Sequence, residues 1–225
     1  MTISDSGYID IDTFYADWSD ITLLQQRRQN TIYTAKRYGK RYLLKAISPE
    51  YQSLTEIRLL QYKEFSLGIT LNHANIAETY SLEEVPQLGR CILMEYVDGM
   101  TLAEWLQSSP SRAQRERALA QLLEVMEYIH SLQLVHNDLK SSNILITRNG
   151  QNVKLIDFGL SDTDSTSDNN NSNTDIQLLA NVLTLLFPNR YRPIARACQL
   201  GKYANIAALK QAFRHRQIWR KSIPY

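Results

Sequence analysis

One short segment, residues 134–146 (LVHNDLKSSNILI), gathers polar side chains between two apolar runs. Its polar residues include His136, Asp138, Lys140 and Asn143. A buried helix or strand does not tolerate so many polar groups unless each has a partner, because an unpaired buried polar group is costly. The segment therefore predicts a loop whose side chains serve a ligand or a reaction.

Composition limits the class of protein. The chain has 225 residues, 44% of them hydrophobic, which is enough for one large domain or two small lobes. The net charge of +2 provides no general attraction to nucleic acid or to a membrane surface. Cys91 and Cys198 lie far apart in apolar runs, which favours buried, reduced thiols.

The first twenty residues contain five aspartates and no lysine or arginine, unlike a secretory signal. No apolar run approaches the roughly 20 residues that a membrane helix needs. We therefore expect a cytoplasmic protein without a membrane span.

The front of the chain reads as strands with one inserted helix. Strands are expected over residues 21–26, 30–38, 39–47 and 91–97, and Tyr38-Gly39 marks the turn of a hairpin formed by the second and third of these. A helix with Glu64 on one stripe is expected to start at Ser48-Pro49, because proline is favoured in a first turn.

The back of the chain reads mainly as helices. Residues 111–132 place five apolar side chains on one helical face: Leu119, Leu122, Leu123, Met126 and Ile129. Asn149-Gly150 predicts a second hairpin, and residues 166–173 form a polar loop. An apolar helix is expected over residues 174–187 with Thr174 as its cap, followed by helices near 194–200 and 205–213.

Several motifs in the chain resemble those of a known protein family. HNDLKSSN resembles the catalytic loop of protein kinases, H-R-D-L-K-x-x-N, and LIDFG (155–159) resembles their metal-binding motif. Residues 43–47, 64–76 and 93–102 resemble the lysine strand, the end of the glutamate helix with its H-x-N-I turn, and the hinge, in the same order. The resemblance implies an α+β, bilobal protein kinase-like fold in a single domain over 1–225, with lobes at 1–95 and 96–225.

The resemblance also implies roles. Asp138 would accept or orient the proton of the acceptor hydroxyl, and Lys140 would neutralise the transferring phosphoryl group. Asn143 and Asp157 would be oxygen ligands of Mg²⁺, which prefers such ligands. ATP would be held by the remaining site residues, which are Lys45, Glu64, Ile32, Glu95 and Val97.

Several residues allow a second interpretation. Glu56 lies on nearly the same helical face as Glu64 and could pair with Lys45 instead, although the spacing to the H-x-N-I turn favours Glu64. His136 is expected to hold the loop rather than to react. Asp175 could be an N-terminal helix charge, but a buried role under the catalytic loop is favoured.

The basic hairpin residues Lys36, Arg37, Lys40 and Arg41 are interpreted as a solvated face.

Three departures from the family pattern stand out. The glycine-rich loop is missing, since Gln25, Arg27 and Asn30 occupy its positions, and we expect that segment to be mobile or splayed without nucleotide. Leu43 replaces a small alanine and crowds the nucleotide site.

The other two departures concern regulation and substrate docking. Asn137 replaces the arginine that reads a phosphorylated loop, so activation by loop phosphorylation is not expected, and alanine at this position should change activity little. Only 18 residues separate Asp157 from Asp175, without an Ala-Pro-Glu motif, so the peptide-docking ledge is reduced.

The leading hypothesis is a small, bacterial-type Ser/Thr protein kinase that uses ATP and Mg²⁺, and Lys140 favours serine or threonine over tyrosine. A kinase of a sugar or lipopolysaccharide core is an alternative, because a reduced ledge suits a non-peptide acceptor. A pseudokinase that only binds partners is another, but it has no need of all four of Lys45, Asp138, Asn143 and Asp157. Nucleic acid is not expected as a partner.

Overall fold

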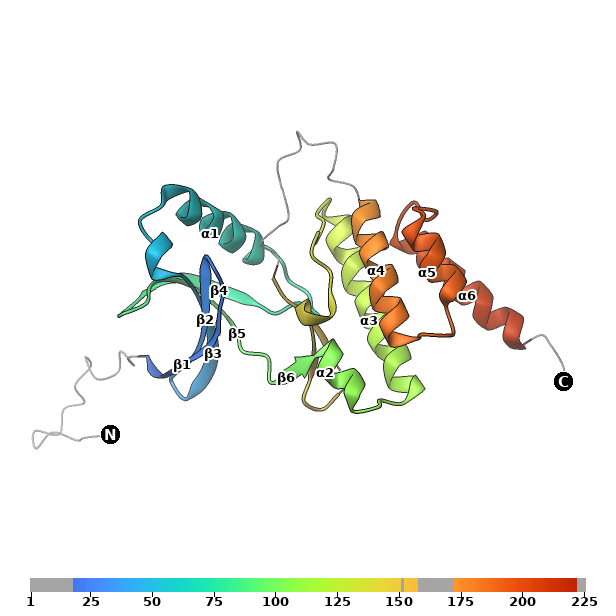
Figure 1. The fold of residues 1–225 in the computed structure, drawn as a ribbon, viewed down its shortest axis with the longest axis horizontal. Coiled ribbons are helices and arrows are strands. Elements are labelled where there is room, and N and C mark those ends of the chain that lie inside the picture. Colours follow the sequence, from blue (N-terminus) through green and yellow to red (C-terminus); the bar gives the residue numbers. More distant parts are fainter. Residues whose placement is uncertain (1–17, 151, 158–171, 222–225) are drawn as a thin grey trace, which may run out of the picture. The chain divides into compact units, whose positions relative to one another are not determined.

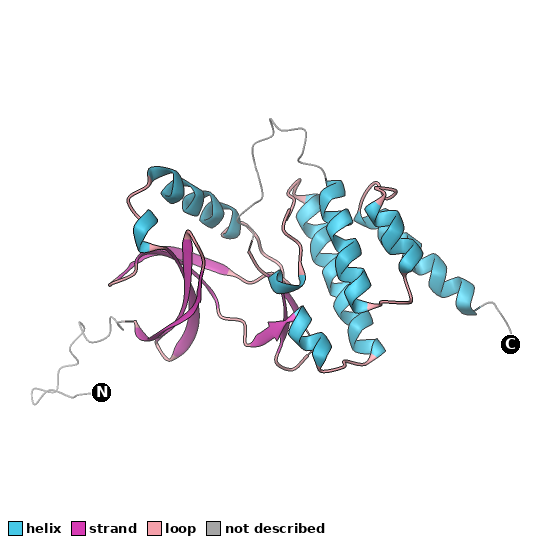
Figure 2. Cartoon of the chain, in the orientation of Figure 1, coloured by secondary structure: helices cyan, strands magenta, loops and turns pink. Residues whose placement is uncertain are grey.

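The computed structural model describes residues 18–150, 152–157 and 172–221, which fall into two compact units (Figure 1). One unit comprises Met1–Ile69 and Glu78–Tyr96, and the other comprises Thr70–Ala77 and Val97–Tyr225. Strands dominate the described part of the first unit, and helices dominate that of the second (Figure 2). The predicted α+β class is confirmed, whereas the grouping of both units into one domain with a boundary at residue 95 stays a prediction.

The first unit is built on a five-stranded antiparallel sheet in the order β1-β2-β3-β5-β4. Its elements are β1 (Ser19–Gln26), β2 (Asn30–Arg37), β3 (Lys40–Ile47), a 3₁₀ helix (Pro49–Tyr51), α1 (Thr55–Gly68), β4 (Thr79–Val85) and β5 (Gly89–Glu95). The β2–β3 turn is formed by Tyr38 and Gly39, whose φ angles of 52° and 73° are both positive, as in a type I′ turn. The predicted hairpin is confirmed.

The inserted helix begins later than predicted. Proline at position 49 opens only the short 3₁₀ helix, and α1 starts at Thr55. The intervening chain is held by Gln52, whose Nε2 donates to the carbonyls of Ile47 and Leu88 at 3.2 and 3.0 Å. The predicted start at Ser48 is therefore that of the 3₁₀ helix, and the α-helix follows six residues after Pro49.

The basic residues of the β2–β3 hairpin do not form a simple solvated face. Arg37 pairs with Glu83 at 2.7 Å, and its guanidinium lies over the ring of Trp18. Lys40 lies over the rings of Tyr42 and Tyr80. Lys36 forms an ion pair with Asp20 at 2.7 Å, and the guanidinium of Arg41 lies over the ring of Tyr96. Lys40 and Arg41 are exposed, as predicted for a solvated face, but aromatic rings also lie beside Arg37, Lys40 and Arg41.

One face of the sheet carries a compact apolar cluster. Its buried members are Ala35, Leu44, Ala46, Val85, Cys91 and Leu93. Burial raises the pKa of the Cys91 thiol to about 12, which keeps this group neutral and unreactive. Neither Cys91 nor Cys198 forms a disulfide, as predicted.

The second unit combines a small sheet, in the order β6-β7-β8, with five α-helices in the described residues. Its elements are β6 (Gly99–Thr101), α2 (Leu102–Gln107), α3 (Arg112–Ser131), a 3₁₀ helix (Ser141–Asn143), β7 (Ile144–Thr147), β8 (Val153–Leu155), α4 (Ser172–Leu186), α5 (Arg192–Gln199) and α6 (Ile206–Lys221). All five apolar residues predicted on the inner face of α3 are buried. Within these described ranges, no helix is long and apolar enough to cross a membrane.

Two local predictions for the second unit need correction. Thr174 lies inside α4 rather than capping it, because the helix begins two residues earlier at Ser172. The β7–β8 hairpin is confirmed, but its connection is longer than two residues. Gly150, at φ 66°, donates its backbone N–H to Thr147, so the turn sits at the start of that connection.

Candidate active site

The polar segment between α3 and β7 forms a connected cluster in the second unit. Asp138 Oδ2 accepts hydrogen bonds from Lys140 Nζ at 2.6 Å and from Asn143 Nδ2 at 2.9 Å. Asn143 Nδ2 also donates to the backbone carbonyl of Asp138 at 2.9 Å. The cluster therefore fixes the Asp138 carboxylate at a site where about a quarter of its side chain remains exposed.

His136 supports this loop and does not face solvent. Its Nδ1 accepts from the backbone N–H of Asp138 at 3.3 Å, and its Nε2 lies 3.2 Å from the carbonyl of Ile156. A carbonyl can only accept, so the ring carries its proton on Nε2. Burial lowers the pKa of His136 below its usual value, which favours this neutral form. These contacts agree with the structural role expected for His136.

Asp175 is fully buried beneath the loop. Its Oδ2 accepts from the backbone N–H of His136 at 2.8 Å, and its Oδ1 accepts from that of Asn137 at 2.9 Å. His130 Nε2, from α3, lies 2.9 Å from Oδ2. Asp175 thus satisfies two backbone donors of the candidate catalytic loop, and the favoured buried role is the one that the structure shows.

Asn137 adopts a left-handed backbone conformation, with φ 59°. Asparagine is one of the few residues other than glycine that enters this region readily. The residue that replaces the family arginine therefore also suits the shape of the loop.

Replacing Asn137 should separate backbone strain from side-chain function. We expect Asn137→Ala to be less stable than Asn137→Gly by about 1 kcal/mol, because a Cβ disfavours positive φ and glycine does not. Urea unfolding of the two variants measures this difference directly. Equal stabilities would show that the angle at this position imposes no strain.

The side chain of Asn143 has a free acceptor suited to a cation. Asn143 is buried, and among the described residues its Oδ1 has no hydrogen-bond partner. Its Nδ2 is held by Asp138, so the amide cannot easily turn to exchange the two atoms. An orphaned buried oxygen fits a hard cation such as Mg²⁺.

Asp157 would be the second oxygen ligand. It lies two residues after the end of β8, with φ 69°. The described part of the chain contains no group of three or more His, Cys, Asp or Glu side chains placed to hold a metal. Two protein ligands suit Mg²⁺, which usually completes its shell with water and substrate phosphates.

The first unit contains the second group of candidate residues. Lys45, on β3, forms an ion pair with Glu64 of α1, and both side chains are largely buried. The predicted partner is confirmed, and Glu56 is exposed near the start of the helix. Gln61 lies one turn before Glu64 and donates from Nε2 to the carbonyls of Lys45 and Arg90 at 3.4 and 3.0 Å.

The nucleotide residues predicted beside Lys45 have defined positions. Ile32 is buried and lies directly opposite Lys45 in the β2–β3 register, so the two side chains share one face of the sheet. Leu43, two residues before Lys45, is half-buried on that same face. Glu95 ends β5, and Val97 begins the longer segment of the second unit. Their contact with a nucleotide stays a prediction.

The β1–β2 connection is closed rather than splayed, while its mobility without nucleotide stays a prediction. Arg27 donates its backbone N–H to the carbonyl of Asn30 at 2.9 Å. Ser48, which follows β3, donates its backbone N–H to the Gln29 carbonyl at 2.9 Å and its hydroxyl to the Arg27 carbonyl at 3.3 Å. Hydrogen bonds donated by Ser48 thus help to close a turn that lacks glycine.

Two supporting residues escaped the sequence analysis. Gln61 was not singled out there, although a polar residue on the inward stripe of a helix is itself a signal. His130 gave no signal, because it reaches Asp175 across 45 residues of sequence.

Comparison with known proteins places the chain in a family. A family model described as "Protein kinase domain" matches residues 28–181, which is more than half of the chain. The chain belongs to the protein kinase family, whose members are phosphotransferases.

Three relatives illustrate the similarity. A probable serine/threonine-protein kinase of Streptomyces coelicolor is 34% identical over 134 residues, covering 55% of this chain and 19% of that protein. The serine/threonine-protein kinase PrkC of Bacillus subtilis is 36% identical over 100 residues, covering 44% and 15%. A serine/threonine-protein kinase of Schizosaccharomyces pombe is 36% identical over 135 residues, covering 58% and 31%. The chain thus spans less than a third of the length of each.

Proposed function

We propose that this chain transfers the γ-phosphoryl group of ATP to serine or threonine hydroxyls of proteins. The observation that carries the proposal is the cluster of Asp138, Lys140 and Asn143, in which a carboxylate is fixed beside a cation and an orphaned amide oxygen. Phosphoryl transfer depends on positioning and on neutralising charge, and these groups supply both.

Each residue of the cluster has a role in the proposed reaction. The acceptor oxygen forms a bond to the γ-phosphorus, the bond from that phosphorus to ADP breaks, and the acceptor proton passes to Asp138. Lys140 stabilises the negative charge on the moving phosphoryl group. Asn143 and Asp157 would hold Mg²⁺, which when bound neutralises phosphate charge.

The residues of the first unit would bind the nucleotide. Lys45 would contact the α- and β-phosphates, and Glu64 would keep its ammonium group in place. Ile32 would contact the base, together with Glu95 and Val97 of the hinge segment. The names of the relatives support a protein acceptor for this chain.

The decisive experiment is an incubation with γ-labelled ATP and Mg²⁺, with the chain alone, with a generic protein acceptor, and with a lipopolysaccharide-core acceptor. We expect label on protein, recovered as phosphoserine or phosphothreonine after acid hydrolysis. Label on the lipid–sugar acceptor alone would favour the sugar-kinase alternative. Nucleotide binding without any transfer would favour a pseudokinase.

Removing a proposed metal ligand should uncouple nucleotide binding from Mg²⁺. In calorimetry, Mg²⁺ should strengthen ATP binding by the wild-type chain, and Asp157→Asn should reduce affinity for the metal–nucleotide complex by about tenfold or more. The control is Glu116→Gln, which removes a partly exposed carboxylate of α3, outside the proposed site. The same ATP affinity with and without Mg²⁺ in the wild type would contradict the metal assignment.

A further inference from the structure

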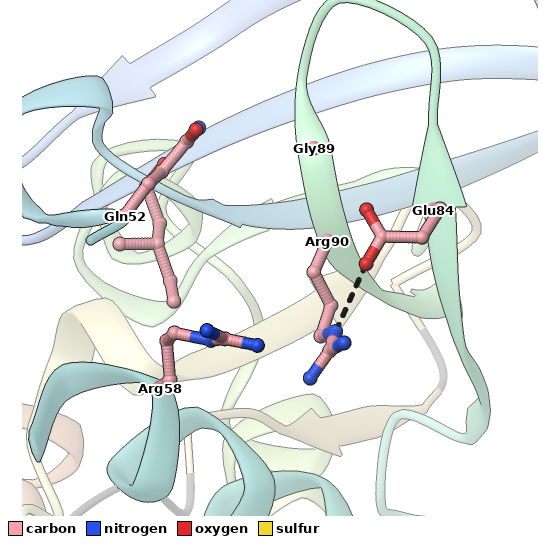
Figure 3. Close-up of a pocket in the computed structure, with 6 residues that line it drawn as sticks. Gln52, Arg58, Glu84, Gly89 and Arg90 are labelled. Carbon is pink, nitrogen blue, oxygen red and sulfur yellow. Dashed lines mark hydrogen bonds and ion pairs between the residues drawn. The ribbon is translucent and has the colours of Figure 1, made fainter. Parts of the chain in front are cut away.

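A second polar pocket lies within the first unit, on α1 and the β4–β5 hairpin. It is lined by Ile47, Gln52, Arg58, Glu84, Gly89 and Arg90. The guanidinium groups of Arg58 and Arg90 point toward one another across it (Figure 3). None of these residues belongs to the candidate active site.

The two arginines have unused hydrogen-bond donors. Among the described residues, the guanidinium of Arg58 has no hydrogen-bond or ion-pair partner. Arg90 donates from Nε to Glu84 Oε1 at 3.1 Å, which leaves its two terminal amino groups. Two like charges that face one another repel, and an anion between them would remove this repulsion.

The ion pair between Glu84 and Arg90 is weak, whereas the residues that line the pocket are held in place. Glu84 pairs with Arg90 at the surface, where 67% of the Glu84 side chain is exposed, and such exposed pairs contribute little stability. Gln52 is held by its two bonds to backbone carbonyls, and Ile47 provides a buried apolar base. The site can therefore exchange Glu84 for an external anion without rebuilding its wall.

The geometry favours a phosphate group over a carboxylate. A carboxylate has two oxygens and one negative charge, so it can neutralise only one of the two arginines even where it bridges both. A phosphate monoester has three terminal oxygens and nearly two negative charges at pH 7, enough to bridge both. Leu54, the residue just before α1 and two residues after Gln52 of the pocket, is exposed and can contact an apolar residue that neighbours the phosphorylated one.

From these features we infer that the pocket between Arg58 and Arg90 binds a phosphorylated serine or threonine side chain of a peptide. The inference concerns a site other than the one that would transfer phosphate. Its test requires no catalysis, so its failure and a failure of the proposed activity can be told apart.

The test measures binding of a short peptide that contains one phosphoserine beside a leucine, by calorimetry on the full chain without nucleotide. We expect binding of the phosphorylated peptide and little of the unphosphorylated one. Arg58→Gln and Arg90→Gln should each weaken binding by about tenfold or more, because each removes a charge-assisted contact. Arg58→Lys should weaken it less than Arg58→Gln, since the charge remains and only the fork is lost.

The matched control is Arg112→Gln, which removes the same charge from an exposed site on α3 and should leave peptide affinity unchanged. Thermal unfolding of every variant checks that it is folded. Wild-type affinity in Arg58→Gln and Arg90→Gln, or equal binding of both peptides, would overturn the inference. Inorganic phosphate that binds as tightly as the phosphopeptide would overturn the assignment to a peptide.

Discussion

Asp138→Asn should abolish phosphoryl transfer while leaving nucleotide affinity nearly unchanged. The residue would act on the acceptor hydroxyl, and a general base or positioning group commonly contributes two to four powers of ten in rate. An asparagine oxygen can still accept from Asn143, so the local hydrogen bonds of the loop should survive. Initial rates with γ-labelled ATP, paired with calorimetry of ATP binding, measure both quantities.

A matched substitution shows whether the loss belongs to this carboxylate. Asp20→Asn removes an exposed aspartate of β1 that pairs with Lys36 at 2.7 Å, and it should keep full activity. Wild-type turnover by Asp138→Asn would assign the activity to a contaminant or to another site.

Asp175→Ala should lower the free energy of unfolding by about 3–5 kcal/mol. The substitution leaves the backbone N–H groups of His136 and Asn137 buried without their acceptor and removes the carboxylate beside His130. Asp175→Asn should also be destabilising, because one of its two side-chain atoms is a donor that would face a backbone donor. Urea unfolding provides the measurement.

The control for this prediction is Glu116→Ala on α3, whose side chain is about one third exposed and whose loss should change stability much less. A value for Asp175→Ala within 1 kcal/mol of wild type would show that the buried network contributes little to the fold.

Elements with strong local signals were predictable from sequence. The apolar stripe of α3 repeats at helical spacing over several turns, and the Tyr38-Gly39 turn depends on backbone angles that glycine favours. β4 was missed because Glu83 and Glu84 interrupt its apolar pattern. Their partners are Arg37 and Arg90, and the first of these lies 46 residues away in sequence.

The candidate site was predictable only as far as its motifs extend. The pairing of Lys45 with Glu64 followed from the family spacing and is confirmed. The positive φ of Asn137 was not predictable, because it reflects the path that Asp175 imposes on the loop from a helix 38 residues away. Closure of the β1–β2 turn was also not predictable, since Ser48, which donates hydrogen bonds to it, lies beyond the next two strands.

The link between Gln61 and the sheet has a consequence for control of this protein. Moving α1 away from β3 and β5 would break the Lys45–Glu64 pair and both Gln61 hydrogen bonds. These losses together amount to a few kcal/mol, on the order of the gap that leaves a minor conformer at about 0.1–10% of molecules. The helix therefore spends nearly all of its time against the sheet.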